Sequence, residues 1–407
     1  MFKFLLFFLL KKIISQIFLP LKLNKTSFNN DFIYNFLNQE FYTEINLGTP
    51  KQKIFSYILF NDSGFYIKKS SFYNHKKSSS FKSLNNFKEE RFFNSKYFEW
   101  ALNSTETFYF SSKKKIKNLN FLYLINEQKK EKYFNENCNS ILGFKPGKNS
   151  FIEILKEKKI IEKKCATFDL KNNVLIIGNF PYEIYDFYNK NEFLISNLEI
   201  HNFNFEWQIK IDKIFSEKLI EFDKICKFNI NVEGLIGTKN IQEFVNKTFF
   251  NVLIEEKKCF HERKEKFGFY YCKNDVNLND FKTIFFNQKS FNFTFEFNFK
   301  DLFKKIENYY FFLIIFNEKI EFGHEIIFGR IFFEKYLLTF EQERKIIAIS
   351  LKNTKKKNKF NIKLLIIIFL LLIILLLLTT ILKLNFLSRK KKHSNIIDYE
   401  YFPKLIE

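Results

Sequence analysis

The chain has 407 residues, of which 46% are hydrophobic, and this content is ample for sizeable folded cores and excludes a disordered polymer. Its net charge of +22 comes from 66 Lys and Arg spread through every segment, so we expect no nucleic-acid partner. With only 10 Gly it contains no Gly-rich phosphate loop, and its five His lie in unrelated polar contexts that give no support to a Ser-His-Asp or Cys-His enzyme.

The N-terminus carries the pattern of a secretory signal. Met1, Phe2 and Lys3 precede an apolar run over residues 4–10, and we predict a signal peptide over residues 1–22. The main domain is then expected to be lumenal or extracellular, in the secretory pathway. Sequons of the type Asn-x-Ser/Thr, which predict a glycoprotein, occur at Asn24, Asn61, Asn103, Asn246 and Asn292.

The body of the chain, from about residue 30 to residue 351, has a mainly β pattern. Two helices are expected, over residues 151–163, with Ser150 and Glu153 as a capping box, and over residues 241–251. Short apolar or aromatic strands separated by Asn, Lys and Ser clusters are expected at residues 41–47, 54–60, 106–110, 174–177 and 205–211.

The C-terminal region contains an uncharged run of Leu and Ile over residues 364–382. At about 1.5 Å per residue, this run nearly spans the ~30 Å hydrocarbon core of a bilayer, so we predict one transmembrane helix. A basic stalk over residues 352–363 precedes it, and a tail over residues 383–407 follows in the cytosol. We therefore expect a single-pass membrane protein that contacts the membrane through this helix.

Several motifs resemble those of the pepsin-like aspartic proteases. Residues 41–52 read FYTEINLGTPKQ and residues 59–67 read LFNDSGFYI, similar to the family's opening strand and the motif that follows it. Further similarity lies in NSILGF at residues 139–144, WQIKID at residues 207–212 and IIFGRIF at residues 326–332. The resemblance implies a mainly β, bilobal fold with a pseudo-two-fold.

The resemblance also predicts how the two lobes are divided and built. The N-terminal lobe is expected over residues 30–190 and the C-terminal lobe over residues 191–351. An apolar-apolar-Gly strand recurs once per lobe, at residues 141–143 and 327–329, and each Gly is expected to let two strands approach closely beneath an active-site loop. The family's flap tyrosine falls near Phe93.

In an active member of this family, two aspartates share a proton and activate a water. A gapless alignment places Leu59 at the first aspartate, whereas a shifted alignment would use Asp62, which begins an Asp-Ser-Gly triplet. Asp62 also fits a plain turn residue. In the second lobe Val232 replaces the aspartate, and Glu233, one position later, is expected to be a solvated loop residue.

The five cysteines favour a disulfide over a metal site. The resemblance implies a bridge between Cys259 and Cys272, which bracket a short polar segment. These two cysteines and His261 supply at most three ligands with irregular spacing, so we expect no zinc and no other cofactor. The pairing of Cys138, Cys165 and Cys226 stays open.

Three functional hypotheses follow from these observations. The first is a non-proteolytic homologue whose inter-lobe cleft binds extended peptides or proteins through backbone hydrogen bonds. The second is an active aspartic endopeptidase that uses Asp62 and an acid near Glu233. The third is a structural or surface protein that uses the fold as a scaffold, because a fold does not fix a function.

Overall fold

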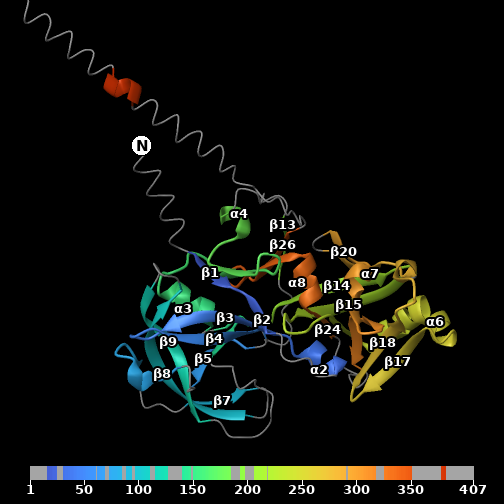
Figure 1. Ribbon diagram of the computed structural model, residues 1–407, viewed down its shortest axis with the longest axis horizontal. Coiled ribbons are helices and arrows are strands. Elements are labelled where there is room, and N and C mark those ends of the chain that lie inside the picture. Colours follow the sequence, from blue (N-terminus) through green and yellow to red (C-terminus); the bar gives the residue numbers. More distant parts are fainter. Residues whose placement is uncertain are drawn as a thin grey trace, which may run out of the picture. The chain divides into compact units, whose positions relative to one another are not determined.

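The computed structural model divides the chain into two compact units, Met1–Asn353 and Thr354–Glu407. It describes residues 16–24, 31–60, 62–68, 73–84, 89–93, 97–110, 115–126, 140–147, 150–184, 193–197, 206–217, 219–289, 292–317, 325–350 and 377–381 (Figure 1).

The described part of the first lobe is built on a nine-stranded sheet, blue to green in Figure 1. Its order is β2-β3-β4-β10-β5-β9-β8-β6, and β7 pairs with β8. The strands are β2 (Lys22–Asn24), β3 (Glu40–Leu47), β4 (Gln52–Leu59), β5 (Phe65–Lys68), β6 (Lys82–Ser83), β7 (Glu89–Phe93), β8 (Tyr97–Tyr109), β9 (Lys115–Asn126) and β10 (Ser140–Gly143).

The described part of the second lobe contains an eleven-stranded sheet, in the order β20-β19-β14-β15-β24-β16-β23-β18-β22-β21, with β17 paired to β18. The strands are β14 (Gln208–Phe215), β15 (Leu219–Phe228), β16 (Leu235–Gly237), β17 (Cys259–Lys264), β18 (Phe267–Lys273), β19 (Ile284–Gln288), β20 (Phe293–Phe297), β21 (Phe303–Ile306), β22 (Tyr309–Phe312), β23 (Ile314–Asn317) and β24 (Glu325–Phe328).

A six-stranded sheet joins the two halves of the sequence, in the order β1-β12-β11-β25-β26-β13. Its centre is the antiparallel pair of β11 and β25, so the end of the domain closes against the first half. The strands are β1 (Ile17–Pro20), β11 (Cys165–Asp169), β12 (Val174–Ile177), β13 (Phe193–Asn197), β25 (Leu337–Glu341) and β26 (Ile346–Ser350). The fold is therefore mainly β with two lobes, as predicted.

The first strand of this sheet limits where a signal peptide can end. β1 lies inside the predicted signal segment 1–22, pairs with β12, and buries Ile17 and Leu19, each 1% exposed. Removing residues 1–22 would take away a strand of the folded domain. The predicted boundary at residue 22 thus falls after a paired strand, and the signal peptide itself stays a prediction.

The helices in the described part of Met1–Asn353 are short. They are α2 (Phe32–Leu37), α3 (Phe151–Glu157), α4 (Pro181–Ile184), α5 (Lys239–Val245), the π-helix η3 (Asn246–Phe250), α6 (Asn251–Glu255), α7 (Phe299–Leu302), α8 (Arg330–Lys335) and the 3-10 helices η1 (His75–Lys77) and η4 (Leu278–Asp280). The predicted cap of α3 is present, because Ser150 Oγ accepts a hydrogen bond from Glu153 N at 3.1 Å. This helix ends at Glu157, earlier than expected, and the helix predicted at 241–251 is the continuous run of α5, η3 and α6.

Phenylalanine rings form the core where the two halves meet. Phe60, directly after β4, is 4% exposed and lies 5.0 Å from the ring of Phe168, 5.5 Å from Phe333 and 5.3 Å from Phe340. The high phenylalanine content thus fills a buried cluster shared by sequence-distant strands. This cluster fixes the end of β4 and the start of the loop that follows.

The predicted membrane segment falls mainly on residues that the structure leaves undescribed. Of residues 364–382 only 377–381 are described, and they are helical, with Thr380 Oγ1 donating to the carbonyl of Leu377 at 2.7 Å. None of the helices among the described residues is long and apolar enough to cross a membrane. The stalk 352–363 and the tail 383–407 lie outside the described residues.

Candidate functional site

The candidate site is formed by two loops, one after β4 and one after β15. In the first lobe, β10 lies between β4 and β5. Leu142 of β10 is paired with Ile58 of β4 in parallel and with Phe65 of β5 in antiparallel register. Residues 59–64 lie between these two paired positions; the first of them, Leu59, ends β4 and pairs with Gly143, and all six are treated together as the first-lobe loop.

The second lobe repeats this arrangement around β24. Phe328 of β24 is paired with Phe228 of β15 in parallel and with Leu235 of β16 in antiparallel register. The loop between these positions consists of residues 229–234. The two loops therefore have the same length and lie between equivalent strands.

Counting along the two loops matches their residues one by one. Asp62 corresponds to Val232, and Leu59 corresponds to Asn229. The strand pairing therefore favours the shifted alignment, which uses Asp62, over the gapless alignment, which uses Leu59. The physical reason is that strand register, rather than the spacing from the Gly-Thr-Pro motif, determines which residues of the two lobes correspond.

The glycines at the ends of β10 and β24 allow these loops to approach the strands, as predicted. A Cβ atom on Gly143 would lie 2.5 Å from the carbonyl oxygen of Asp62, and one on Gly329 would lie 2.4 Å from that of Val232 and 2.1 Å from that of Gly234. Such contacts leave no room for a side chain. The pseudo-two-fold therefore extends to the backbone packing beneath both loops.

The second-lobe loop also contacts the first lobe. Asn231 Nδ2 donates a hydrogen bond to the carbonyl oxygen of Ile58 at 2.8 Å, so this loop touches the end of β4. The sequence analysis singled out neither Asn231 nor Ile58.

Asp62 is the first-lobe counterpart of Val232 and has a local structural role. It is half-buried, and its Oδ1 accepts a hydrogen bond from Gly64 N at 2.6 Å. Its carbonyl oxygen accepts a hydrogen bond from Lys145 N at 2.8 Å. A carboxylate bonded to the amide two residues ahead is an Asx turn, so the turn chemistry expected for Asp62 is present.

The matching position of the second lobe is apolar. Val232 is 3% exposed, and a valine side chain can neither exchange a proton nor polarise a water. Its carbonyl oxygen accepts a hydrogen bond from Arg330 N at 2.7 Å.

Glu233 is buried, at 1% exposure, which corrects the expectation of a solvated loop residue. Its Oε1 accepts a hydrogen bond from Arg330 Nη2 at 3.1 Å and contacts Lys304 Nζ. A buried carboxylate persists where charged partners compensate its desolvation, and these two cations do so. Arg330 Nη1 in turn donates to Gln39 Oε1 at 2.9 Å.

A segment ahead of β3 packs against this second-lobe loop. Glu233 N donates a hydrogen bond to the carbonyl oxygen of Phe36 at 2.8 Å, and Gln39 N donates to that of Asn231 at 2.8 Å. Phe36 of α2 is fully buried, and a Cβ on Gly234 would lie 2.8 Å from its ring. Residues 31–39, which lie between β2 and β3 of the first-lobe sheet in sequence, thus form part of the surroundings of the second-lobe site.

Aromatic and charged contacts hold α2 in place on the second lobe. The ring of Phe32 lies 4.5 Å from that of Phe311 and 5.4 Å from that of Phe269. Asp31 Oδ2 lies 2.6 Å from Lys264 Nζ. Sequence reasoning missed this docking, since the segment carries no motif, and its one signal was the run of aromatic and apolar residues at 32–37.

The region expected to form the flap is a hairpin of β7 and β8. Phe93 ends β7 and pairs with Tyr97, the first residue of β8. The structure describes only the backbone here, so the role of the flap residue stays a prediction.

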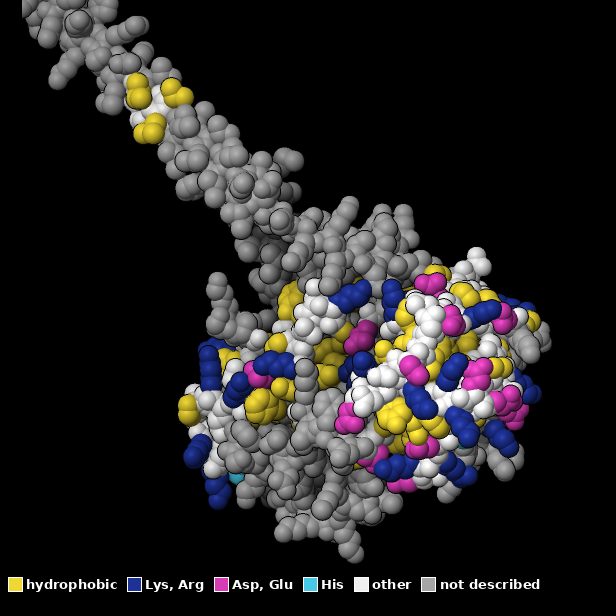
Figure 2. Space-filling view, turned by 45° about the vertical axis from the view of Figure 1, so that its right-hand side comes forward, with side chains coloured by type: hydrophobic (Ala, Val, Ile, Leu, Met, Phe, Trp, Pro, Cys, Tyr) yellow, Lys and Arg dark blue, Asp and Glu magenta, His cyan; other side chains and the backbone are white. Residues whose placement is uncertain are grey.

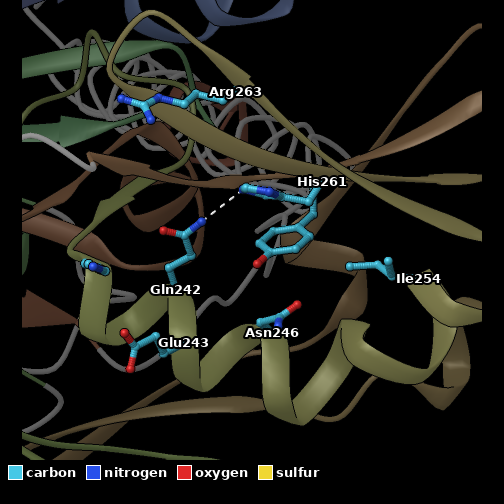
Figure 3. A pocket seen from close by; sticks show the side chains of 8 residues that line it. Gln242, Glu243, Asn246, Ile254, His261 and Arg263 are labelled. Carbon is cyan, nitrogen blue, oxygen red and sulfur yellow. Dashed lines mark hydrogen bonds between the residues drawn. The ribbon is translucent and has the colours of Figure 1, made fainter.

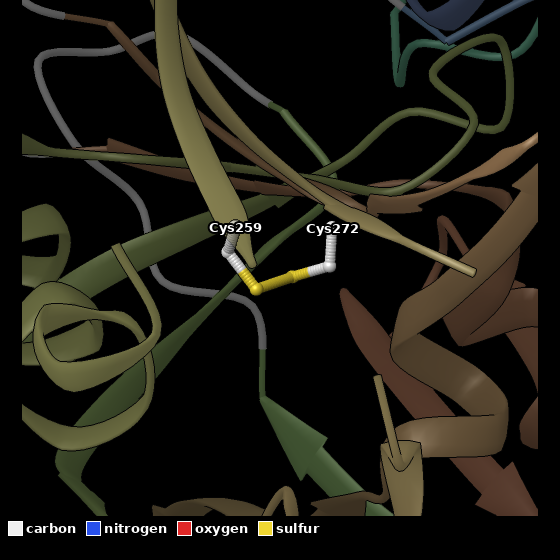
Figure 4. The surroundings of a disulfide bond; sticks show 2 residues. All are labelled: Cys259 and Cys272. Atoms are coloured by element: carbon white, nitrogen blue, oxygen red, sulfur yellow. A yellow bond between two sulfur atoms is a disulfide. The ribbon is translucent and has the colours of Figure 1, made fainter. Parts of the chain in front are cut away.

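The predicted disulfide is confirmed. Cys259 and Cys272 face each other across the antiparallel pair of β17 and β18, with an Sγ–Sγ distance of 2.02 Å (Figure 4). Cys165 and Cys226 are buried, and Cys138 lies outside the described residues. In the described part of the chain, no group of three or more His, Cys, Asp or Glu side chains could hold a metal ion.

Comparison with solved structures shows what the fold is similar to. Conglutin gamma, a basic 7S globulin from lupine seeds, superposes with a TM-score of 0.61 at 11% identity, covering 83% of this chain and 95% of that chain. The basic 7S globulin from soybean gives a TM-score of 0.60 at 10% identity, covering 83% and 97%. At these identities the likeness supports the pepsin-like fold alone.

Comparisons at the level of sequence add no family. No model of a known protein family matches the chain. No curated protein matches it either.

Proposed function

We propose that this chain is a membrane-anchored, non-proteolytic pepsin-like protein whose inter-lobe cleft binds extended peptide segments. The observation that carries the proposal is that Asp62 in one loop corresponds in position to Val232 in the other. Aspartic peptide hydrolysis needs two carboxylates that share a proton, one as base and the other as acid. This chain supplies a carboxylate at only one of the two matched positions.

The neighbouring acid does not replace the missing one. Glu233 lies one position beyond Val232, and its carboxylate is engaged by Arg330 and Lys304. Rotating it toward a substrate would leave two partly buried cations without their carboxylate. Since a misplacement of ~1 Å can cost on the order of a hundredfold in rate, Glu233 is a poor substitute.

Peptide binding needs no catalytic pair. Extended peptides bind sheet proteins through main-chain hydrogen bonds, with pockets for alternate side chains giving specificity. Loss of one acid removes the hydrolysis of a bound segment but not the backbone donors and acceptors that hold it. A partner with an exposed, extended segment therefore fits this function better than a small molecule.

Membrane anchoring by residues 364–382 is part of the proposal and rests on the length of the apolar run. The main domain would be lumenal or extracellular and the tail 383–407 cytosolic. The mixture of charges on the face in Figure 2, where Lys and Arg side chains alternate with Asp and Glu, fits a protein partner better than nucleic acid. Protection of the main domain, with digestion of the tail, in sealed vesicles exposed to protease from the cytosolic side would support this orientation.

The function is tested with the full-length chain in detergent. We expect no pepstatin-sensitive cleavage of a peptide library at acidic pH, together with saturable binding of some extended peptides. Asp62→Ala should leave that binding within about twofold, because main-chain contacts dominate it. Absence of peptide binding would favour the scaffold hypothesis instead.

An active endopeptidase is the second candidate, because the intact triplet of Asp62, Ser63 and Gly64 lies in the matched position of the first lobe. Under this hypothesis the wild-type chain cleaves peptides at acidic pH, and both Asp62→Ala and Glu233→Gln abolish cleavage. Such a result would overturn the non-proteolytic proposal.

A further inference from the structure

A cavity of about 640 Å³ lies in the second lobe between the run of α5, η3 and α6 and the hairpin of β17 and β18 (Figure 3). Gln242, Glu243 and Asn246 line it from the helical side, and His261 and Arg263 line it from β17. Its size lies within the range of roughly 300–1,000 Å³ typical of small-molecule sites.

The walls of this cavity are fixed by packing. Phe250 of η3 stacks on Tyr270 of β18, with ring centroids 4.3 Å apart and an interplanar angle of 7°. The disulfide between Cys259 and Cys272 joins the two strands of the hairpin. The helical wall contains a π-helix, a rare conformation that occurs frequently at functional sites. The pocket is therefore a preformed feature and not a gap between loosely placed loops.

The charged side chains that line this cavity favour the binding of an anion. Lys239 and Arg263 bring two positive charges to the lining and Glu243 brings one negative charge, so the lining is positive even with a neutral imidazole. An arginine guanidinium suits the planar, bidentate recognition of a carboxylate or a phosphate.

The remaining lining groups suit hydroxyl groups on a small carbon skeleton. The side-chain amides of Gln242 and Asn246 each carry donors and an acceptor, which is what a hydroxyl needs. Gln242 Nε2 lies 2.9 Å from His261 Nε2, so the two side chains orient each other across the pocket. Ile254 adds an apolar surface at the side of the cavity.

We propose that this cavity binds a small organic anion in which a carboxylate or phosphate group is joined to a hydroxyl-bearing skeleton, as in an acidic sugar. The lining residues all belong to the second lobe, and none of them belongs to the loops that carry Asp62 and Val232. The proposal is therefore independent of peptide binding and of proteolysis.

The test is a calorimetric titration of the full-length chain with four probes: glucuronate, glucose 6-phosphate, methyl glucoside and acetate. Because Asn246 also begins a sequon, intact mass first shows that no glycan occupies it. We expect at least one of the two sugar anions to bind about tenfold or more tightly than the neutral sugar or acetate, since only it uses both kinds of group. The two anionic probes distinguish a carboxylate ligand from a phosphate ligand.

Matched variants decide whether the binding is at this cavity. Arg263→Ala and Lys239→Ala should each weaken binding by roughly threefold to tenfold, and Glu243→Gln should strengthen it by about twofold. Lys247→Ala is the control, because Lys247 is exposed on the same helical run and does not line the cavity. No binding of either anion, equal binding of methyl glucoside, or equal losses in Lys247→Ala and Arg263→Ala would each overturn the proposal.

Discussion

The carbonyl oxygens of Asp62 and Val232 lie over equivalent glycines of the two lobes. A Cβ on Gly143 would be 2.5 Å from the first oxygen, and a Cβ on Gly329 would be 2.4 Å from the second. The backbone packing is thus alike on both sides, whereas a carboxylate is present at only one of the two matched positions.

The two loops agree in their backbone packing and differ in the chemistry of their side chains. The close approach at Gly143 and Gly329 involves backbone atoms of the loops, so it does not depend on which side chain the loop carries. Val232 is buried, and at a desolvated position an apolar side chain costs less than an unpaired carboxylate would.

The close packing at Gly329 predicts a large loss of stability in Gly329→Ala. Its Cβ would lie 2.1 Å and 2.4 Å from two backbone oxygens, which cannot rotate away as a side chain can. We expect the free energy of unfolding to fall by about 3 kcal/mol, at the upper end of overpacking costs. Urea unfolding followed by tryptophan fluorescence measures this change.

Gly237→Ala is the matched control for this substitution. Its Cβ would come no closer than 3.2 Å, to a ring atom of Phe316, so a shift of only a few tenths of an ångström relieves the contact. We expect a change within about 1 kcal/mol, because glycine also carries an entropic cost in a strand. Equal losses in the two variants would show that close approach to the loop is not the cause.

The cations around Glu233 predict a second loss of stability, in Arg330→Met. The substitution leaves a carboxylate that is 1% exposed with Lys304 as its remaining cation and removes the donor to Gln39. We expect a loss of about 3 kcal/mol, because breaking a buried ion pair leaves its partner uncompensated. Thermal and urea unfolding measure the loss.

A double substitution tests this cause. Glu233→Gln in the Arg330→Met background should recover part of the loss, since the charge left without its partner is then absent. Lys282→Met, which breaks an exposed pair with Glu217, should cost about 0–1 kcal/mol. If the double variant is less stable than Arg330→Met, charge burial is not the explanation.

Much of the fold was predictable because the signals were repeated along the chain. The strand patterns at β3 and β12, the capped start of α3 and the paired glycines at Gly143 and Gly329 agree with the structure. Each depends on local periodicity or on the space that a glycine leaves beside the backbone, and short stretches of sequence carry the signal for both. The disulfide between Cys259 and Cys272 was predictable from the resemblance.

The site itself was harder to predict, because strand register is a tertiary property. Counting from the Gly-Thr-Pro motif selected Leu59, whereas matching the two lobes by their strand pairing makes Asp62 the counterpart of Val232. Glu233 was expected in solvent because its partners, Arg330 and Lys304, lie about a hundred and about seventy residues away in sequence.

A buried acid in the first lobe predicts a third loss of stability, in Tyr73→Phe. Tyr73 and Glu106 are both fully buried, and the Tyr73 hydroxyl donates to Glu106 Oε2 at 2.8 Å. Tyr73→Phe removes this donor, and we expect a loss of about 1–3 kcal/mol, which is the cost of leaving a buried acceptor unsatisfied. Tyr109→Phe is the control, with an expected change within about 0.5 kcal/mol, because its hydroxyl lies 3.5 Å from Thr49 Oγ1.

The same pair predicts a pH dependence. Burial, and then the charge of Glu106, raise the pKa of Tyr73 far above its usual range. The unfolded tyrosine loses its proton near pH 10, whereas the folded one keeps it, so its contribution to stability is present below pH 10 and declines as the pH rises further. Tyr73→Phe should therefore make the stability fall less steeply above pH 10. An unchanged slope would contradict the assigned environment.

The asymmetry between Asp62 and Val232 predicts the effect of restoring the missing acid. Val232→Asp would place a second carboxylate at the position that matches Asp62, without changing the loop length or the packing of Gly329. Two nearby carboxylates repel each other, so one should hold a proton at acidic pH, as hydrolysis requires. We expect the variant to gain weak, pepstatin-sensitive cleavage of peptides at acidic pH, absent from the wild type and from Val232→Asp combined with Asp62→Ala. Leu59→Asp combined with Asp62→Ala and Val232→Asp tests the other register, and cleavage by that triple variant alone would show that Leu59 occupies the first catalytic position after all.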